Sequence, residues 1–153
     1  MIFAIDPGPK QSAYLKLSEE TEIIYGFGIL ENEKLLEIIR LIASHETIVC
    51  EMIQSFGMPV GKEIFETVLF IGQIKEASLR NESSLNLIYR KEIKQHFCQT
   101  NRATDANIRR VLIDRFGELG TKKNPGKLYG IKKDIWSALA VAVFFSDQQN
   151  KIH

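Results

Sequence analysis

The alternation of apolar and polar positions divides the chain into predicted strands and helices. Five short apolar runs have the length and the β-branched and aromatic content of strands, at residues 2–5, 12–17, 22–30, 47–50 and 85–89. Five stretches have helical periodicity, at residues 32–45, 61–79, 91–97, 105–116 and 135–145. Short links join the first three strands, which indicates an antiparallel meander, and the later strand–helix–strand steps indicate parallel crossovers.

These elements predict an α/β fold with a mixed five-stranded sheet and helices on both faces. Asn32 is expected to cap the first helix, and Thr104 or Asp105 the fourth. The apolar face of helix 61–79 is so broad that we expect burial on more than one side. The last helix, which Asp134 opens, is apolar nearly all round and should pack into the interior.

The composition agrees with one globular domain that spans residues 1–153. A chain of 153 residues with 44% hydrophobic content can bury a core of its own. The first residues lack the features of a secretory signal, and no apolar run approaches the ~20 residues of a membrane span, so we expect a soluble cytoplasmic protein. Cys50 and Cys98 lack CxxC spacing and are expected to be reduced and buried.

Charge is distributed unevenly along the chain, although the net charge is only +1. Residues 1–89 carry 7 Lys or Arg and 13 Asp or Glu, whereas residues 90–133 carry 12 Lys or Arg and 4 Asp or Glu. The local positive excess is sufficient to hold several phosphates, and counterion release would then make binding depend strongly on salt. A solvated basic face explains the same charges equally well.

Three carboxylates lie where the predicted topology can bring them together. Asp6 and Glu51 each end a core strand, and Asp134 begins a buried helix. If the first and fourth strands are parallel neighbours, Asp6 and Glu51 end side by side at a strand spacing of ~5 Å. Unpaired carboxylates held this close repel one another, and a hard cation such as Mg²⁺ neutralises them and bridges to phosphate. Two ions ~4 Å apart would suit phosphodiester cleavage.

Each acid also has a purely structural explanation. Asp-Pro-Gly is a common turn, and an Asp at a helix start is an ordinary cap. Glu51 could pair with a basic residue, although a carboxylate that ends an all-apolar strand is costly without a partner. The conjunction of the three favours the metal site.

The segments around these acids resemble the RuvC family of Holliday-junction resolvases, particularly the short members encoded by bacteriophages. The resemblance runs in family order from residue 2 to about 145, through IFAIDPGPKQSAYL, IVCEMIQSFGMPVGKEIFETVLFIGQIKEA, YRKEIKQHFCQTNRATDANIRRVLIDRFG and YGIKKDIWSALAVAVFF. It implies an RNase H-like fold, a homodimer, and dependence on Mg²⁺ or Mn²⁺ with one or two ions per subunit. It also implies paired cuts in four-way DNA junctions that leave 5′ phosphates. If a phage encodes the chain, the cytoplasm would be that of the bacterial host.

The resemblance also assigns residues. Asp6, Glu51 and Asp134 would be metal ligands, and Lys94, on the family's DNA-contacting helix, would approach the scissile phosphate. With the basic segment, it leads us to expect a DNA surface of Phe56, Lys91, Lys94, Arg102, Arg109, Arg110, Lys132 and Lys133.

The chain departs from the family's pattern at two charged positions. A second acid on the last helix is replaced by Ser137, a poorer metal ligand, which leaves a second ion weakly held or Asp134 to serve alone. The family's second lysine corresponds to Asp105, and Arg102 or a lysine of the 122–133 loop is the candidate to replace its charge.

A third departure concerns the aromatic wedge of bacterial members, which corresponds to Gln54 here. Phe56 is the candidate substitute, and a packing role for Phe56 is the alternative. Helix 61–79 is the expected dimer surface, where Gly72 would permit close approach of a partner; contact with the sheet would explain the same glycine.

Two other functions remain open from the sequence. Ser137 favours a catalytically weak protein that only binds junctions, and the same fold can carry a nuclease that acts on RNA or on RNA/DNA hybrids.

Overall fold

A mixed sheet of five strands organises the protein. The computed structural model describes residues 1–152, so His153, the last residue of the predicted domain, lies outside the described part. The strands are β1 (Ile2–Asp6), β2 (Gln11–Leu17), β3 (Ile24–Glu31), β4 (Thr47–Met52) and β5 (Ser84–Tyr89), in the order β3-β2-β1-β4-β5. β1, β2 and β3 form an antiparallel meander, whereas β1–β4 and β4–β5 are parallel pairs. The predicted mixed sheet is confirmed.

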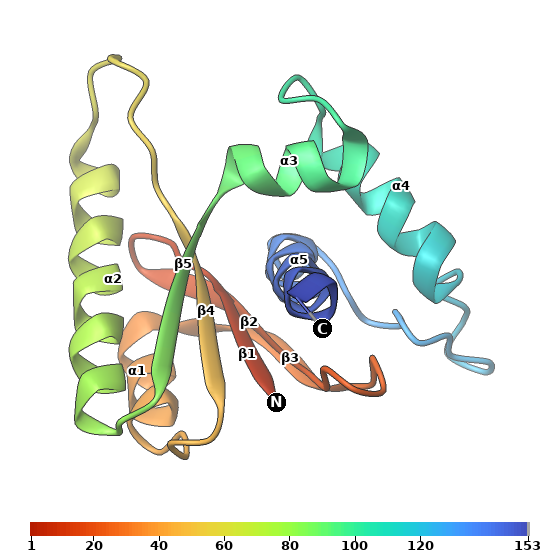
Figure 1. The fold of residues 1–153 in the computed structure, drawn as a ribbon, viewed down its shortest axis with the longest axis horizontal. Helices are drawn as coiled ribbons and strands as arrows, with labels where there is room; N and C mark the ends of the chain where they lie inside the picture. The colour runs from red at the N-terminus through yellow and green to blue at the C-terminus, as the bar shows by residue number, and fades with distance from the viewer. Residues whose placement is uncertain (153) are drawn as a thin grey trace.

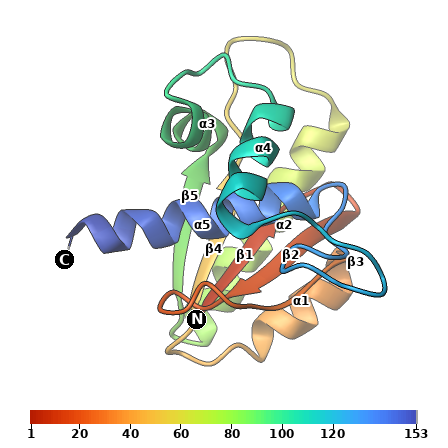
Figure 2. The ribbon, with the colours of Figure 1, turned by 90° about the vertical axis from the view of Figure 1, so that its right-hand side faces the viewer.

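Helices cover both faces of this sheet, as predicted. The helices are α1 (Asn32–Arg40), α2 (Lys62–Arg80), α3 (Arg90–Cys98), α4 (Asp105–Phe116) and α5 (Ile135–Ile152). α1 and α2 lie on one side of the sheet, and α3, α4 and α5 lie on the other (Figure 1). After a quarter turn, α5 is seen crossing the sheet and continuing beyond it toward the C-terminus (Figure 2).

Strand alternation divides the buried residues between the two layers. Ile2 and Ala4 of β1 point into the cluster formed with α3, α4 and α5, whereas Phe3 and Ile5 point into the cluster formed with α1 and α2. All four side chains are fully buried, because successive residues of a strand face opposite sides and both sides are covered. β1 is therefore a central strand, and its end is held firmly on both faces.

Two helix boundaries differ from the predictions. The first helix was expected to reach His45 but ends at Arg40. The N–H groups of Leu41 and Ile42 donate to the carbonyls three residues earlier, as in a 3₁₀ turn, and the chain then turns toward β4. The last helix was expected to end near Phe145 but continues to Ile152. Polar contacts stabilise the added turns of α5, and the hydrophobic pattern alone does not register them.

Those polar contacts join three helices and one turn. Asp147 of α5 receives hydrogen bonds from Arg115 of α4 at 2.8 and 2.9 Å, and its Oδ2 lies 2.7 Å from Nε2 of His96 on α3. Arg115 also pairs with Glu22, in the turn before β3. Burial opposes ionisation of Asp147, but the hydrogen bonds from Arg115 and His96 outweigh it, so the pKa of Asp147 lies below its ordinary value. The network fixes α3 and α4 against α5.

Helix α2 is buried on one side only, contrary to the expectation of burial on more than one. Phe70 and Ile74 pack against the sheet, whereas Phe65 and Leu69 are 64% and 69% exposed. A methyl group added at Gly72 would meet nothing within 4 Å, so contact with the sheet does not explain this glycine. The outer face of α2 is an exposed apolar stripe.

Two further expectations concern the membrane and the cysteines. Within residues 1–152, no helix is long and apolar enough to cross a membrane. Both cysteines are unpaired thiols; Cys50 is buried as expected, whereas Cys98 is only partly buried.

Asn32 has a different role from the predicted helix cap. The N-cap of α1 is Glu31, and Asn32 is the first helical residue. Its Nδ2 donates to the Gly8 carbonyl at 2.9 Å and its Oδ1 accepts from the Ser12 hydroxyl at 2.7 Å, while the Gly8 N–H donates to Ser12 Oγ at 3.0 Å. This ring of hydrogen bonds holds the turn that directly follows Asp6.

We expect Asn32→Ala to lower the free energy of unfolding by about 1–3 kcal/mol, because it leaves the buried Ser12 hydroxyl and the Gly8 carbonyl without these partners. Urea denaturation followed by circular dichroism measures the change. Asn150→Ala, at an exposed position of α5, is the control and should alter stability by less than about 0.5 kcal/mol. Equal losses in both variants would contradict a special role for Asn32.

Candidate active site

The strand register brings Asp6 and Glu51 together at one edge of the sheet. Ile5 pairs with Cys50 in the parallel β1–β4 ladder, so Asp6 and Glu51 are the next residues on the two strands. Ala4 and Val49, two residues earlier on each strand, point toward α5, and alternation therefore directs Asp6 and Glu51 to the same side. The predicted parallel neighbours are confirmed, with both acids at the carboxyl ends of their strands.

Asp134 reaches this edge from the start of α5. Its carbonyl accepts hydrogen bonds from the backbone N–H of Ser137 and Ala138, at 3.0 and 3.1 Å, so Asp134 stands at the helix N-terminus as predicted. It is exposed, whereas Asp6 and Glu51 are partly buried. The charge of Asp134 reaches Asp6 strongly enough to contribute to the raised pKa of Asp6.

The pKa of the Asp6 carboxyl group is raised well above its ordinary value. The pKa of Asp6 is raised from 3.8 to about 7, first by burial and then by repulsion from Glu51 and Asp134. Arg90 and a hydrogen bond from Ser137 oppose the shift but do not cancel it. Arg90 and Ser137 therefore offset only part of the burial and repulsion that oppose ionisation of Asp6.

Glu51 is paired with a basic residue, which was one of its two interpretations from the sequence. Nη1 of Arg90 lies 3.3 Å from Oε2 of Glu51, and Nη2 of Arg90 pairs with Oδ1 of Asp105. Burial nevertheless raises the pKa of Glu51; Arg90 is the main opposing influence, Asp105 adds to the rise, and Lys94 opposes it. Glu51 thus lies among charges from α3 and α4.

Arg90 is the site residue that the sequence reasoning missed, having been counted only as part of the basic segment. It is the first residue of α3 and directly follows Tyr89, which pairs with Met52 in the β4–β5 ladder. A basic residue just after a strand that lies beside the Glu51 strand was the available signal. Asp105 is paired with Arg90. That Arg102 or a lysine of the 122–133 loop supplies the charge of the family's second lysine stays a prediction.

The donor set suits a hard cation, although its members are not drawn together. Asp6, Glu51 and Asp134 offer carboxylate oxygens, the ligands that Mg²⁺ and Mn²⁺ prefer, and the raised pKa of Asp6 reflects the charge that such a cation would neutralise. Yet in the part of the chain described here, no three His, Cys, Asp or Glu side chains are gathered closely enough to hold a metal ion. In this arrangement Glu51 is paired with Arg90, and Asp134 is exposed.

Ser137 and Cys50 are two uncharged neighbours of the acids. The Ser137 side chain, where the resemblance led to the expectation of a fourth acid, makes a hydrogen bond that lowers the pKa of Asp6. Burial, and then the charges of Asp6 and Glu51, raise the pKa of the Cys50 thiol, so this thiol stays neutral.

The basic residues expected to bind DNA divide into two groups. Lys94 on α3 lies near enough to Glu51 to lower its pKa, and Lys132 and Lys133 are exposed directly before Asp134. Arg109 and Arg110 lie farther along on α4 and already have partners. The Arg109 guanidinium is 4.6 Å from the centre of the Trp136 ring, and Arg110 pairs with Asp114 at 3.0 Å.

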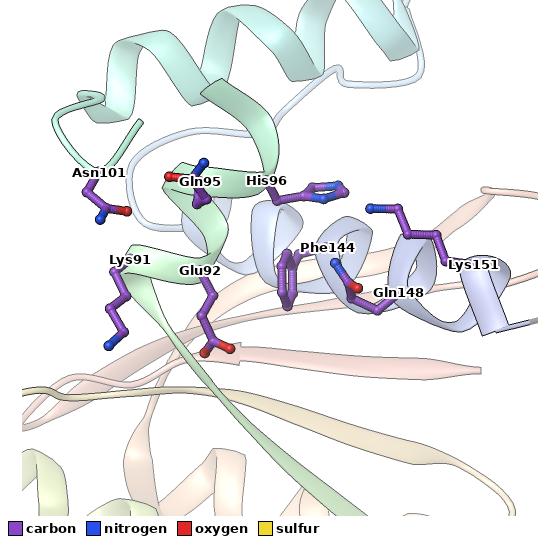
Figure 3. Close-up of a pocket in the computed structure, with 8 residues that line it drawn as sticks. All are labelled: Lys91, Glu92, Gln95, His96, Asn101, Phe144, Gln148 and Lys151. Atoms are coloured by element: carbon purple, nitrogen blue, oxygen red, sulfur yellow. The ribbon is translucent and has the colours of Figure 1, made fainter. Parts of the chain in front are cut away.

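Lys91 and Arg102 lie apart from the acids. Lys91 lines a groove of about 600 Å³ between α3 and the C-terminal half of α5, together with Gln95, Asn101, Gln148 and Lys151. These side chains border the space between the two helices (Figure 3). Arg102 is exposed in the turn between α3 and α4.

The opposite flank of Asp134 is acidic. A hollow of about 860 Å³ lies between the β1–β2 turn and the N-terminal ends of α1 and α2. Its charged lining consists of Lys10 and five acids, Glu31, Glu33, Glu63, Glu66 and Asp134. Basic and acidic surfaces therefore meet at the edge that carries Asp6 and Glu51.

Phe56, in the segment between β4 and α2, does not pack against the described chain, since it is 75% exposed. The packing alternative is wrong for residues 1–152. Gln54, at the position of the family's wedge, is only partly buried, and its buried Oε1 has no hydrogen-bond partner within that range.

Comparison with solved structures shows the RNase H-like fold of RuvC. Thermus thermophilus RuvC matches with a TM-score of 0.68 and 12% identity, over 97% of this chain and 96% of that one. T. thermophilus RuvC bound to a Holliday junction substrate matches with a TM-score of 0.73 and 11% identity, over 98% and 94%. Fowlpox virus resolvase in complex with Holliday junction DNA matches with a TM-score of 0.62 and 15% identity, over 97% and 99%.

By sequence, no family model and no curated protein matches the chain. The similarity therefore establishes the fold, and the chemistry of the site has to be argued from its own residues.

The raised pKa of Asp6 predicts a pH-dependent effect of Asp6→Asn on stability in EDTA. The folded state binds the Asp6 proton more tightly than the unfolded state, so wild-type stability declines as the pH rises from about 4 to about 7. The variant lacks this decline. At pH 8 it should be the more stable protein, by up to about 4 kcal/mol, at about 1.4 kcal/mol per pH unit between the two pKa values.

Urea denaturation at pH 4 and pH 8 tests this expectation, and the two proteins should be similar at pH 4. The exposed Glu37→Gln variant serves as the control and should change stability little at either pH. A variant that is less stable than wild type at pH 8 would show that the Asp6 charge is already compensated.

Proposed function

We propose that the protein is a divalent-metal-dependent endonuclease that cuts branched DNA, four-way junctions above all, and leaves 5′ phosphates. The observation that carries the proposal is the meeting of Asp6 and Glu51 on adjacent parallel strands, with Asp134 arriving from α5. Excess negative charge at a strand-end site is the environment that a phosphodiester-cleaving metal centre requires.

Asp6, Glu51 and Asp134 would hold Mg²⁺, for which Mn²⁺ would substitute, with one or two ions per subunit. When bound, such an ion supplies Lewis acidity and lowers the pKa of a water molecule. Ser137 orients Asp6 through its hydrogen bond rather than adding a fourth negative ligand. The smaller donor set favours one firmly held ion over two.

Lys94 is the basic residue best placed to meet the scissile phosphate, because its charge already acts on Glu51. Lys132 and Lys133, next to Asp134, would contact the backbone on the other side of the acids. Lys91, Arg102, Arg109 and Arg110 would bind phosphates farther along the DNA. The groove beside Lys91 also offers amide groups, which are suited to phosphate and sugar contacts.

Branched DNA is favoured as the substrate by the solved structures with this fold. Two of them are named as complexes with Holliday junction DNA, from T. thermophilus and fowlpox virus. The exposed Phe56, on the segment that follows the Glu51 strand, is the candidate to wedge into the junction. The exposure of its side chain supports contact with a partner or substrate rather than packing in the core.

A homodimer through α2 would supply the second active site that paired cuts require. Phe65, Val68 and Leu69 form an exposed apolar stripe on the outer face of this helix. Gly72 lies on the same helix with open space in place of a side chain, which would let a partner helix approach closely. Burial of this stripe would account for an apolar face broader than the sheet alone can cover.

Replacement of any metal-binding acid should abolish cutting while leaving junction binding intact. Asp6→Asn, Glu51→Gln and Asp134→Asn should each reduce cleavage of a labelled four-way junction in Mg²⁺ at least ~100-fold. Gel-shift assays in EDTA should give affinities close to that of wild type. A variant that cuts at the wild-type rate would remove its residue from the site, and a wild-type protein that binds junctions without cutting them would support the binding-only alternative favoured by Ser137.

The same assay separates the substrate classes. Four-way junction, flap, linear duplex and RNA/DNA hybrid are offered in parallel, and the junction should be cut fastest. Preference for the hybrid would replace the resolvase proposal with a nuclease of RNA-containing substrates on the same fold.

The dimer predicts that Leu69→Glu yields monomers, because it places a charge in the centre of the apolar stripe. Sedimentation velocity compares the variant with wild type at the same concentration. Leu41→Glu, at an exposed leucine outside α2, is the matched control and should leave the dimer intact. A monomeric wild-type protein would overturn the proposed dimer, and so would a Leu69→Glu protein that stays dimeric.

A further inference from the structure

The Arg90 guanidinium is shared between an inner and an outer carboxylate. Nη1 faces Glu51, whose side chain is 17% exposed, and Nη2 faces Asp105, whose side chain is 76% exposed. Arg90 itself is 25% exposed. One cation therefore connects a candidate metal ligand with an acid at the surface.

The base of the Arg90 side chain is held in place by its neighbours. Arg90 directly follows β5 and begins α3, where the Tyr89 N–H donates to Oε2 of Glu92 at 2.8 Å in a capping box. Asp105 begins α4, which Thr104 caps by accepting from the Asn107 N–H. Capping contacts thus hold the helix starts that carry Arg90 and Asp105, so an exchange of partners would require movement of the side chains alone.

Arg90 and a divalent cation make competing demands on Glu51. A guanidinium is permanently charged and binds the carboxylate oxygens that a metal ion would also take. With Glu51 on Arg90, residues 1–152 contain no gathered group of three potential ligands. Asp105 offers the guanidinium a second partner, so Glu51 can leave without stranding a half-buried positive charge.

We propose that Arg90 is a positioning residue that competes with a divalent cation for Glu51, and that Asp105 retains the guanidinium beside the site when Glu51 turns to the cation. The ion pair of Arg90 with Glu51 would therefore oppose metal binding until the guanidinium moves to Asp105. Arg90 stabilises the acids while no metal is bound, and its shift to Asp105 leaves its remaining donors available to a nearby phosphate. This inference rests on the proposed metal-dependent function.

The test measures Mn²⁺ binding to DNA-free protein, with free Mn²⁺ followed by electron paramagnetic resonance. Arg90→Gln removes the competitor and should tighten Mn²⁺ binding roughly tenfold, the size expected for loss of a charged hydrogen bond. Asp105→Asn leaves the guanidinium with Glu51 alone and should weaken Mn²⁺ binding several-fold. Arg40→Gln, an exposed arginine on α1, controls for the general loss of a positive charge and should change nothing.

A double-mutant cycle tests whether Asp105 acts through Arg90 or only through its own charge. If Asp105 acts through Arg90, adding Asp105→Asn to Arg90→Gln should change Mn²⁺ affinity little. An effect of Asp105→Asn that is equally large in both backgrounds would overturn the inference, as would an Arg90→Gln protein that binds Mn²⁺ no more tightly than wild type. If Arg90→Gln does not fold, Arg90→Lys replaces it in the cycle. A lysine keeps the charge but does not span both acids, so it should tighten binding by a smaller factor, and unchanged affinity would count against the inference.

The outcome is independent of the cleavage assay. Opposed shifts in Mn²⁺ affinity without any cutting of branched DNA would sustain the role of Arg90 and refute the proposed nuclease. Junction cutting without those shifts would sustain the nuclease and refute the role of Arg90.

Discussion

Parallel pairing of β1 with β4 sets two carboxylates side by side at the end of a central, fully covered part of the sheet. Apolar layers on both faces leave Asp6 and Glu51 little water, and burial is accordingly the leading cause of the raised pKa of each. Arg90 and Ser137 lower the pKa of Asp6, and Arg90 and Lys94 lower that of Glu51, but these influences offset the rise only in part. The incomplete compensation of these buried acids is a property of the fold, and under the proposed function it would favour the binding of a cation.

The parts of this arrangement that depend on local pattern were predictable from the sequence. Apolar runs that end in Asp6 and Glu51 placed both acids at strand ends, and the crossover rule made their strands parallel neighbours. The start of the last helix at Asp134 followed from the polar loop before it and the apolar run after it. The family resemblance added the RNase H-like fold, which the solved structures confirm. The metal, the DNA and the dimer stay predictions.

Features that depend on contacts between distant segments were not predictable in the same way. The ion pair of Arg90 with Glu51 joins residues 39 positions apart, and the place of Arg90 directly after β5 was its one signal in the sequence. Asn32 was assigned to a helix cap because its partner Gly8 is 24 residues away. The last turns of α5 depend on Asp147 meeting Arg115 and His96. In each case a polar side chain has its partner in a segment far away in the sequence.

The distribution of charge constrains how a nucleic acid would reach the acids. The charged lining of the hollow beside Asp134 is mainly acidic, so a phosphate backbone would be repelled from the side of α1 and α2. The charge of Lys94 on α3 acts on Glu51, and two lysines directly precede Asp134, whose charge acts on Asp6. Under the proposed function, a DNA backbone held by these lysines would lie close to Asp6 and Glu51. Arg90 is paired with Glu51, and an approaching phosphate would offer its guanidinium an alternative to that carboxylate. Under the proposed function, substrate arrival and release of Glu51 would therefore favour each other, because both draw on the same cation.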